Sequence, residues 1–159
     1  MRASRVVLTF AGLALVLMVL GLASCCQQQA VDPSATEEMI ALADLADTIW
    51  NGGDLDLIDN LVGPDFVRHV VDISEDVVGP VGFGENVVTL RTQFPDFHVS
   101  FDEVIVAGDR IVLRWTVTGT DTGGVGELPP TGMSIQISGA SIIHVIDGMF
   151  AEEWMYYNE

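Results

Sequence analysis

Two side chains near the C-terminus could carry out acid–base chemistry, the carboxylate of Glu153 and the imidazole of His144. They flank Asp147-Gly148, a dipeptide typical of a two-residue type I′ turn, because both central residues of that turn need a positive φ. If Ile146 pairs with Met149 across the turn, His144 and Glu153 lie diagonally on one face of a β-hairpin. A carboxylate beside an imidazole on a dry face can share a proton, and burial moves a carboxyl towards the pKa that a general base needs.

Each of these residues also has a purely structural interpretation. Glu153 is either the buried acid or base, or a strand glutamate that faces solvent or pairs with an arginine such as Arg114. A lone strand histidine such as His144 is either a catalyst or a hydrogen-bonded residue in the core or at its rim. The residues alone leave both alternatives open.

The hairpin that must position this pair runs from Met133 to Tyr157 and is largely apolar on both faces. A sheet that is apolar on both faces has to be covered twice. We therefore expect helices on one face and other protein, such as a second subunit, on the other.

Hydrophobic periodicity upstream predicts three helices and three further strands. Residues 34–51 follow a capping box formed by Ser34 and Glu37, and Asp54 is expected to cap the second helix. The predicted helices span 34–51, 55–61 and 79–94, and the predicted strands span 65–72, 97–107 and 110–118. This order predicts an α+β fold in which a curved antiparallel sheet wraps around the helices.

A long loop is predicted between the strand 110–118 and the C-terminal hairpin. Residues 119–132, GTDTGGVGELPPTG, contain five glycines and two prolines and cannot form regular structure. Such a loop is long enough to close over the mouth of a pocket, and its Asp121 could reach that mouth or simply form a turn.

The N-terminus has the layout of a secretory signal peptide. Arg2 and Arg5 precede an uncharged apolar run over residues 6–22, and small residues follow it. The tetrapeptide Leu22-Ala23-Ser24-Cys25 resembles the lipobox of bacterial lipoproteins, in which the cysteine becomes the lipidated first residue. We expect a signal peptide over 1–24, a tether over 25–33 and a domain over 34–159, exported and membrane-anchored through Cys25. An uncleaved anchor and ordinary secretion are the alternatives.

The charge balance is strongly acidic. Beyond Cys25 the chain carries 23 acidic side chains against four arginines, a formal charge of −19, and it has no lysine. Such a surface repels phosphate backbones, so nucleic acid is excluded as a partner. The sequence contains no metal-ligand spacing and no phosphate-binding loop, so we expect no cofactor.

Large apolar side chains spaced through the domain could line a hydrophobic pocket that binds a small hydrophobic ligand. Aromatic residues and methionines at such spacings can equally belong to an ordinary core. The candidate substrate-binding residues are Trp50, Phe66, Phe83, Trp115, Met155 and Tyr157.

Three phrases of the sequence resemble, in order, the SnoaL-like polyketide (ester) cyclases of the nuclear-transport-factor-two-like superfamily. They are WNGGDLDLIDNLVGPDFVRH, GPVGFGENVVTLRTQFPDFHVSFDEVIVAGDRIVLRWTVTGTDTG and PPTGMSIQISGASIIHVIDGMFAEEW, and the resemblance covers about residues 34–159. It implies a cone-shaped domain with an apolar pocket between sheet and helices, often dimeric through the outer sheet face. It also implies acid–base chemistry on a small apolar carbonyl compound without a metal or cofactor.

The resemblance adds one candidate residue and reveals one departure. His69 matches a position that is commonly histidine, which implies that it orients substrate in the pocket or makes a structural hydrogen bond. The family places its aspartate directly after the tryptophan of the last strand, where this chain has Met155, with Ala140 and Ser141 opposite. Two hypotheses follow: an enzyme that uses Glu153 and His144, or a tethered domain that binds a hydrophobic ligand or a protein partner without catalysis.

Overall fold

The computed structural model of the protein describes residues 33–70, 75–124, 126 and 128–158. The chain divides into two units, Met1–Ala30 and Val31–Glu159, and the described residues belong to the second. The predicted signal peptide and its lipobox cysteine, Cys25, lie outside the described residues. None of the described helices combines the length and the apolar character that a membrane span requires.

The element order is the predicted one, except that a two-residue strand that was not predicted, β2 (Val77–Val78), lies between the first strand and the last helix. The elements are α2 (Pro33–Gly52), η1 (Leu55–Leu57), α3 (Ile58–Leu61), β1 (Val62–Val70), β2 (Val77–Val78), α4 (Gly79–Gln93), β3 (His98–Ala107), β4 (Arg110–Thr120), β5 (Ser134–Ile146) and β6 (Met149–Asn158). The predicted second helix is a 3₁₀ turn followed by a single α-helical turn. Asp54 precedes it, but its side chain makes no capping hydrogen bond.

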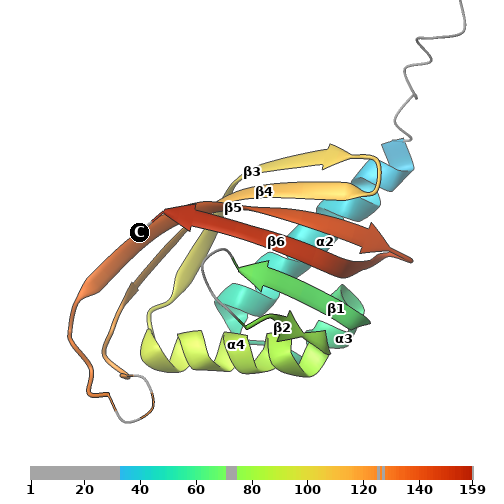
Figure 1. The fold of residues 1–159 in the computed structure, drawn as a ribbon. Coiled ribbons are helices and arrows are strands. Elements are labelled where there is room, and N and C mark those ends of the chain that lie inside the picture. The colour runs from blue at the N-terminus through green and yellow to red at the C-terminus, as the bar shows by residue number, and fades with distance from the viewer. Residues whose placement is uncertain (1–32, 71–74, 125, 127, 159) are drawn as a thin grey trace, which may run out of the picture. The chain divides into compact units, whose positions relative to one another are not determined.

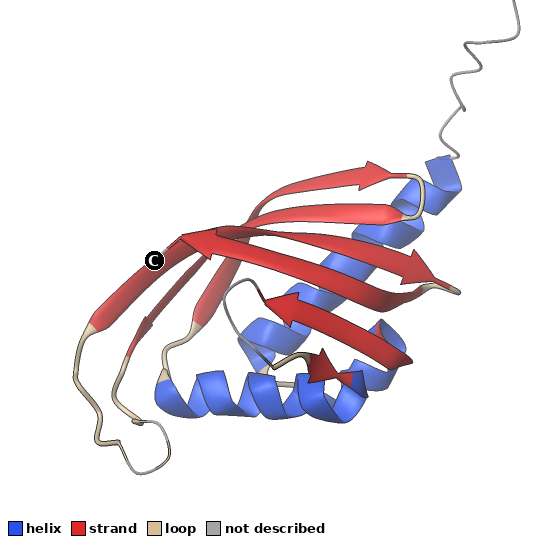
Figure 2. Cartoon of the chain, viewed as in Figure 1, coloured by secondary structure: helices blue, strands red, loops and turns tan. Residues whose placement is uncertain are grey.

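The strands form one curved sheet in the order β2-β1-β6-β5-β4-β3, with the helices packed against one side (Figures 1 and 2). The α+β prediction is confirmed, but the sheet is mixed, because β1 runs parallel to β6. A parallel neighbour requires a long crossover connection, and the chain between these two strands supplies one. All the other strand pairs are antiparallel.

The C-terminal end of α2 is fixed to the sheet, which places Trp50 against the inner sheet face. The chain leaves the helix at Gly53, whose φ of 73° is accessible to glycine, and its N–H donates to the Ile49 carbonyl at 2.8 Å. The amide of Asn51 bonds both backbone groups of Val99 on β3, at 2.8 and 2.9 Å. A single side chain thus continues the hydrogen bonding of this edge strand.

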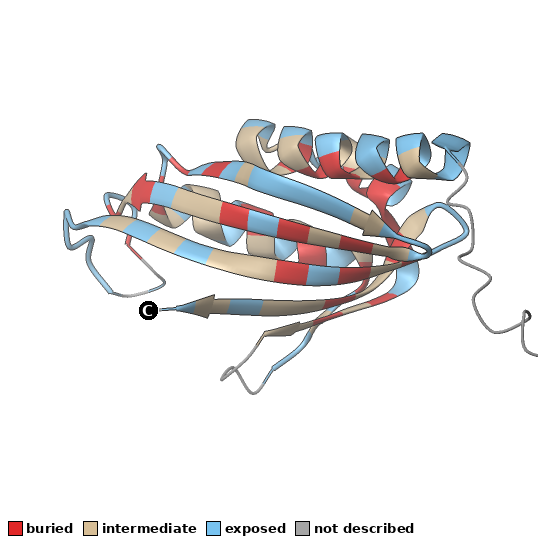
Figure 3. Ribbon diagram, turned by 90° about the horizontal axis from the view of Figure 1, so that it is seen from above, coloured by how far each residue is buried: buried red, intermediate tan, exposed pale blue. Residues whose placement is uncertain are grey.

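Buried and exposed residues alternate along the strands, as the banding in Figure 3 shows. On β1, Phe66 and Arg68 are buried on the inner face, whereas Val67 and His69 are half-buried on the outer face. This alternation is the one predicted for the strand, and it places an arginine in the core.

The C-terminal hairpin turns where predicted but changes register three residues later. Asp147 and Gly148 have φ values of 52° and 75°, and Ile146 pairs with Met149. Between Val145 and His144 the register shifts, so that His144 pairs with Glu152 and Ala151 is the extra residue of a β-bulge.

The bulge makes the predicted placement of His144 and Glu153 on one face of the hairpin wrong. Beyond it, Glu153 pairs with Ile143 on the inner face, while His144 and Glu152 share the outer face. A shift of one residue exchanges the two faces of a strand. The bulge keeps Phe150 and Met155 on the inner face together and carries Glu153 inward with them.

Gly139 on β5 provides a test of how closely the inner face is packed. Gly139 pairs with Trp115, and a Cβ at this position would meet the Tyr156 carbonyl and lie 2.5 Å from the Trp115 ring. We expect Gly139→Ala to lower the free energy of unfolding by about 1–3 kcal/mol through overpacking. Urea unfolding measures the change. Gly52→Ala, which meets nothing within 4 Å, should cause no loss, and equal effects of the two variants would contradict this packing.

Candidate functional site

A cavity of about 450 Å³ lies between the inner sheet face and the helices α2 and α4. Four of the six predicted pocket residues line it: Trp50, Trp115, Met155 and Tyr157. Phe66 and Phe83 do not. Both are fully buried behind the cavity wall, where their rings pack edge to face with centroids 5.9 Å apart. The volume is in the range of small-molecule sites.

The polar centre of this cavity is an ion pair between Arg68 of β1 and Glu153 of β6. The two residues are direct partners in the parallel register, so their side chains point to the same face. Arg68 Nε donates to Glu153 Oε2 at 2.8 Å, and the side chains are 2% and 5% exposed. The arginine partner considered for Glu153 is therefore present, but it is Arg68 rather than Arg114.

Aromatic rings surround the Arg68 guanidinium. Its central carbon lies 4.8 Å from the centroid of Phe83, 5.2 Å from Trp50 and 5.9 Å from Phe66. These distances are within the range of cation–π attraction, and a guanidinium tolerates such stacking because it is weakly hydrated. The two phenylalanines predicted to touch ligand instead hold the cation that lines the cavity.

Asn86 of α4 completes the polar cluster. Arg68 Nη1 donates to Asn86 Oδ1 at 3.1 Å. Arginine cannot lose its charge in a protein, so Glu153 is the counterion that the burial of Arg68 requires. Because a guanidinium has only donors, Asn86 must turn its side-chain oxygen towards Arg68. Sequence reasoning missed both Arg68 and Asn86. The one available signal was that Arg68 lies two residues after Phe66 and therefore on the same face of the strand.

The position at which the family resemblance places an aspartate–histidine pair has no ionisable group. Met155 pairs directly with Ser141 across the β5–β6 ladder, and both residues line the cavity. Ser141 Oγ accepts a hydrogen bond from Trp115 Nε1 at 3.1 Å. On this strand the carboxylate that reaches the cavity is therefore Glu153, two residues before the position at which the resemblance places the aspartate.

His144 lies outside the cavity. Its Nε2 contacts Asp109 Oδ2 at 3.0 Å, next to the β3–β4 turn on the outer side of the sheet. The predicted acid–base couple of His144 and Glu153 is thus split between the two faces, and His144 has no access to a ligand bound in the cavity.

His69 is also on the outer face, because it follows Arg68 on the strand. Its Nδ1 contacts Asp76 and its Nε2 contacts Glu152, each at 3.0 Å, and its ring lies 5.7 Å from that of Trp154. Both nitrogens face carboxylates, which requires the doubly protonated imidazolium. The hydrogen bonds to Glu152 and then Asp76 raise the pKa of His69 above its ordinary value of 6.5. The prediction that it orients substrate in the pocket is wrong, and the structural alternative describes it.

The Gly- and Pro-rich loop does not contribute its described residues to the cavity. Asp121 organises it by accepting hydrogen bonds from the Thr131 hydroxyl at 2.7 Å, the Thr131 amide at 3.1 Å and the Gly124 amide at 3.2 Å. The hydroxyl and amide of Thr131 lower the pKa of Asp121. Two loop amides also donate to the Gln93 carbonyl at the end of α4. Asp121 therefore forms a turn, the second of its predicted roles.

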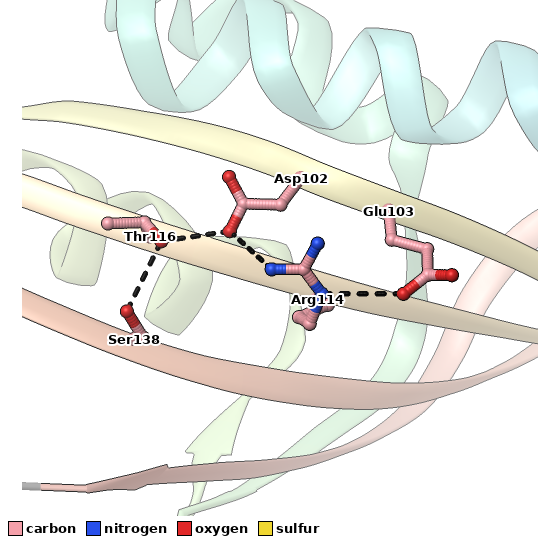
Figure 4. A network of polar contacts seen from close by, with 5 residues as sticks. All are labelled: Asp102, Glu103, Arg114, Thr116 and Ser138. Atoms are coloured by element: carbon pink, nitrogen blue, oxygen red, sulfur yellow. Dashed lines mark hydrogen bonds and ion pairs between the residues drawn. The ribbon is translucent and has the colours of Figure 1, made fainter.

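On the outer face, a second ion-pair network joins β3, β4 and β5 (Figure 4). Arg114 contacts Asp102 at 3.0 Å and Glu103 at 3.3 Å, and its side chain is 56% exposed. Thr116 links Asp102 to Ser138. Among the residues that the structure describes, no group of three or more His, Cys, Asp or Glu side chains could hold a metal ion.

The buried and exposed ion pairs should differ in energy. Removing one member of a buried pair leaves an uncompensated charge, so Arg68→Met and Glu153→Leu should each cost about 3–5 kcal/mol of unfolding free energy, whereas the double variant should regain a large part of it. The matched cycle of Arg114→Met and Glu103→Leu should show a coupling below about 1 kcal/mol. Urea unfolding measures both cycles, and similar coupling energies would contradict the burial of Arg68.

His69 should make stability depend on pH. Because the folded state raises its pKa, the stabilisation is complete below about pH 6.5 and is lost as the pH rises through the raised value. We expect the stability difference between the wild type and His69→Gln to shrink from pH 5.5 to pH 9. A difference that stays constant across this range in urea unfolding would show that the imidazolium contributes nothing.

Comparison with solved structures finds the same fold in several proteins. The chain is similar to AclR, a proposed hydroxylase from Streptomyces galilaeus, with 27% identity over 77% of this chain and 76% of that one and a TM-score of 0.65. A proposed polyketide cyclase from Bacillus cereus has 23% identity over 81% and 80%, with a TM-score of 0.67. A protein of ketosteroid isomerase-like fold from Catenulispora acidiphila, bound to trimethylamine, has 14% identity over 74% and 85%, with a TM-score of 0.62.

Comparison with curated proteins gives no match. The model of the SnoaL-like polyketide cyclase family, in contrast, matches residues 40–159, which include every strand and all but the start of α2. The chain therefore belongs to the SnoaL-like polyketide cyclase family.

Proposed function

We propose that this protein binds a small apolar carbonyl compound in the cavity and moves a proton on it with Glu153, without a cofactor. The single observation that supports this function is the Arg68–Glu153 ion pair in the wall of a largely apolar cavity. A carboxylate can accept a proton from a carbon next to a carbonyl group, and a neighbouring cation can stabilise the oxyanion that forms.

The charges balance in this step. The Glu153 carboxylate takes the proton, and the electron pair of the C–H bond moves into the carbonyl group to give an enolate. Glu153 becomes neutral while the enolate oxygen becomes negative, so the Arg68 guanidinium keeps one counterion throughout. Return of the proton to carbon restores the carboxylate. Alternatively, the enolate carbon attacks a second carbonyl group of the same molecule, and the alkoxide that forms takes the proton from Glu153 to give an alcohol and the carboxylate.

A non-catalytic binding domain for a hydrophobic ligand is the second candidate. It is favoured by Met155 and Ser141, which stand where the family resemblance places an aspartate and a histidine. In that case the ion pair serves to orient the ligand and to close the inner end of the cavity.

We also propose export and membrane anchoring through Cys25, on the basis of the lipobox-like tetrapeptide. The outer sheet face is proposed to pair with a second copy. Apolar side chains exposed there support this pairing, namely Ile105, Ile142 and Tyr156, which are 49%, 38% and 46% exposed.

Deuterium exchange tests the proton transfer without knowledge of the natural substrate. The neutral bicyclic ketone 2-tetralone is incubated with the protein in D₂O, and loss of its α-protons is followed by NMR. We expect the wild type to accelerate exchange over buffer and Glu153→Gln to lower the accelerated rate by about 10²-fold or more. Glutamine keeps an oxygen that can accept the Arg68 hydrogen bond, so the geometry is retained while the base is lost.

Glu152→Gln is the matched control, because Glu152 is the adjacent residue on the outer face. It should exchange as fast as the wild type. Quenching of tryptophan fluorescence reports binding separately, and circular dichroism confirms that each variant is folded. Binding of the ketone without accelerated exchange in the wild type would overturn the catalytic proposal in favour of the binding domain.

A further inference from the structure

The only cation in the cavity wall, among its described residues, is already paired with a carboxylate. The Nε and Nη1 groups of Arg68 donate to Glu153 and Asn86, and aromatic rings approach the guanidinium within cation–π distance. Arg68 is 2% exposed. An anionic ligand that entered the cavity would have to displace Glu153 from this site or remain without a counterion.

A second carboxylate, that of Glu75, also lines the cavity. Glu75 is exposed and lies just before β2, next to Asp76, whose carboxylate is held by His69 at 3.0 Å. This contact anchors Asp76, the neighbour of Glu75 in the chain. Within the described part of the chain, Glu75 forms no ion pair with an arginine or a histidine.

We infer that the cavity selects uncharged apolar ligands over anionic ones of the same shape, and that Glu75 is the residue that sets this selectivity. The charges of the described lining residues are one guanidinium and two carboxylates, which leaves one net negative charge at the Glu75 end. The inference rests on the proposed function insofar as the cavity must bind ligand. It extends that function by assigning the ligand class: a neutral ketone, ester or amide rather than a free acid, sulfonate or phosphate.

The physical basis is short-range repulsion in a partly desolvated site. A ligand anion has to compete with the Glu153 carboxylate for the guanidinium and is repelled by Glu75 across a medium less polar than water. A neutral ligand carries no such cost and retains the full benefit of burying its apolar surface. Repulsion by an exposed carboxylate is screened by salt, which gives the effect a distinctive dependence on ionic strength.

Two fluorescent probes with a common carbon skeleton test this inference. N-phenyl-1-naphthylamine is uncharged, and 8-anilino-1-naphthalenesulfonate differs from it by a sulfonate. Both are titrated into the full-length protein, with excitation through tryptophan. We expect the uncharged probe to bind at least tenfold more tightly at low ionic strength, and the ratio to fall as salt is added.

Glu75→Gln should tighten the binding of the sulfonate by about tenfold while leaving the uncharged probe within twofold of the wild type. Glu85→Gln is the matched control. It removes the same charge from α4 at a residue that does not line this cavity, and it should leave the ratio unchanged. Val117→Phe, which fills part of the cavity, should weaken both probes and thereby place them inside it.

The outcomes separate this inference from the proposed function. If neither probe binds, or Val117→Phe affects neither, the cavity does not bind apolar ligands and the proposed function fails with it. If both probes bind the wild type equally, ligand binding stands and the charge selectivity is overturned. If Glu75→Gln and Glu85→Gln change the ratio equally, the selectivity belongs to the overall charge of the protein and the role of Glu75 is overturned.

Discussion

The inner architecture of this protein depends on a permanently charged guanidinium buried in an aromatic wall. Three different elements supply the partners that a buried arginine requires. Glu153 on β6 is the counterion, Asn86 on α4 accepts a hydrogen bond, and the ring of Trp50 on α2 makes a cation–π contact. The strand β6 and the helices α4 and α2 are thereby brought to a common point. A cavity lined largely by apolar side chains is built around that point.

Two features of the sheet, a parallel strand pair and a β-bulge, make the arrangement possible. The parallel pairing of β1 with β6 sets Arg68 directly beside Glu153, and the bulge at Ala151 turns Glu153 inward while Phe150 remains in the core. Without the bulge, the buried Phe150 and Glu153 would point to opposite faces. Bulges of this kind re-aim a side chain next to a functional site at the cost of one unpaired residue.

The two faces of the sheet have separate polar systems. The inner face holds the buried pair, in which the charges are desolvated and each partner depends on the other. The outer face holds exposed pairs around Arg114, His69 and His144, which water and salt screen. Family membership is shown by residues 40–159, yet the ionisable group inside the cavity is displaced by two positions from the one that the resemblance implies, Glu153 instead of residue 155. Chemistry in this fold therefore has to be argued from the site itself.

Local pattern was sufficient for the elements of the fold. Helical periodicity in α2 and α4, the Asp147-Gly148 turn and the alternation along β1 each depend on a few neighbouring residues, and each was predicted correctly in type and nearly in extent. The sequence likewise identified Glu153 as the candidate carboxylate, and four of the six residues that it predicted for the pocket do line the cavity. These are consequences of periodicity and of the apolar character of single positions.

The partners of those residues were decided by the tertiary structure alone. Because the hairpin is apolar on both faces, its pattern does not specify which face is inside, and the bulge that settles the question has no local signature. The parallel pairing of β1 with β6 joins residues 85 positions apart in the sequence, so no local pattern indicated Arg68, rather than Arg114, as the partner of Glu153. The expected hairpin register placed His144 with Glu153, and the family resemblance gave His69 a role in the pocket. In the folded sheet the bulge puts His144 on the face opposite to Glu153. His69 lies on that outer face because the alternation along β1 turns its neighbour Arg68 inward.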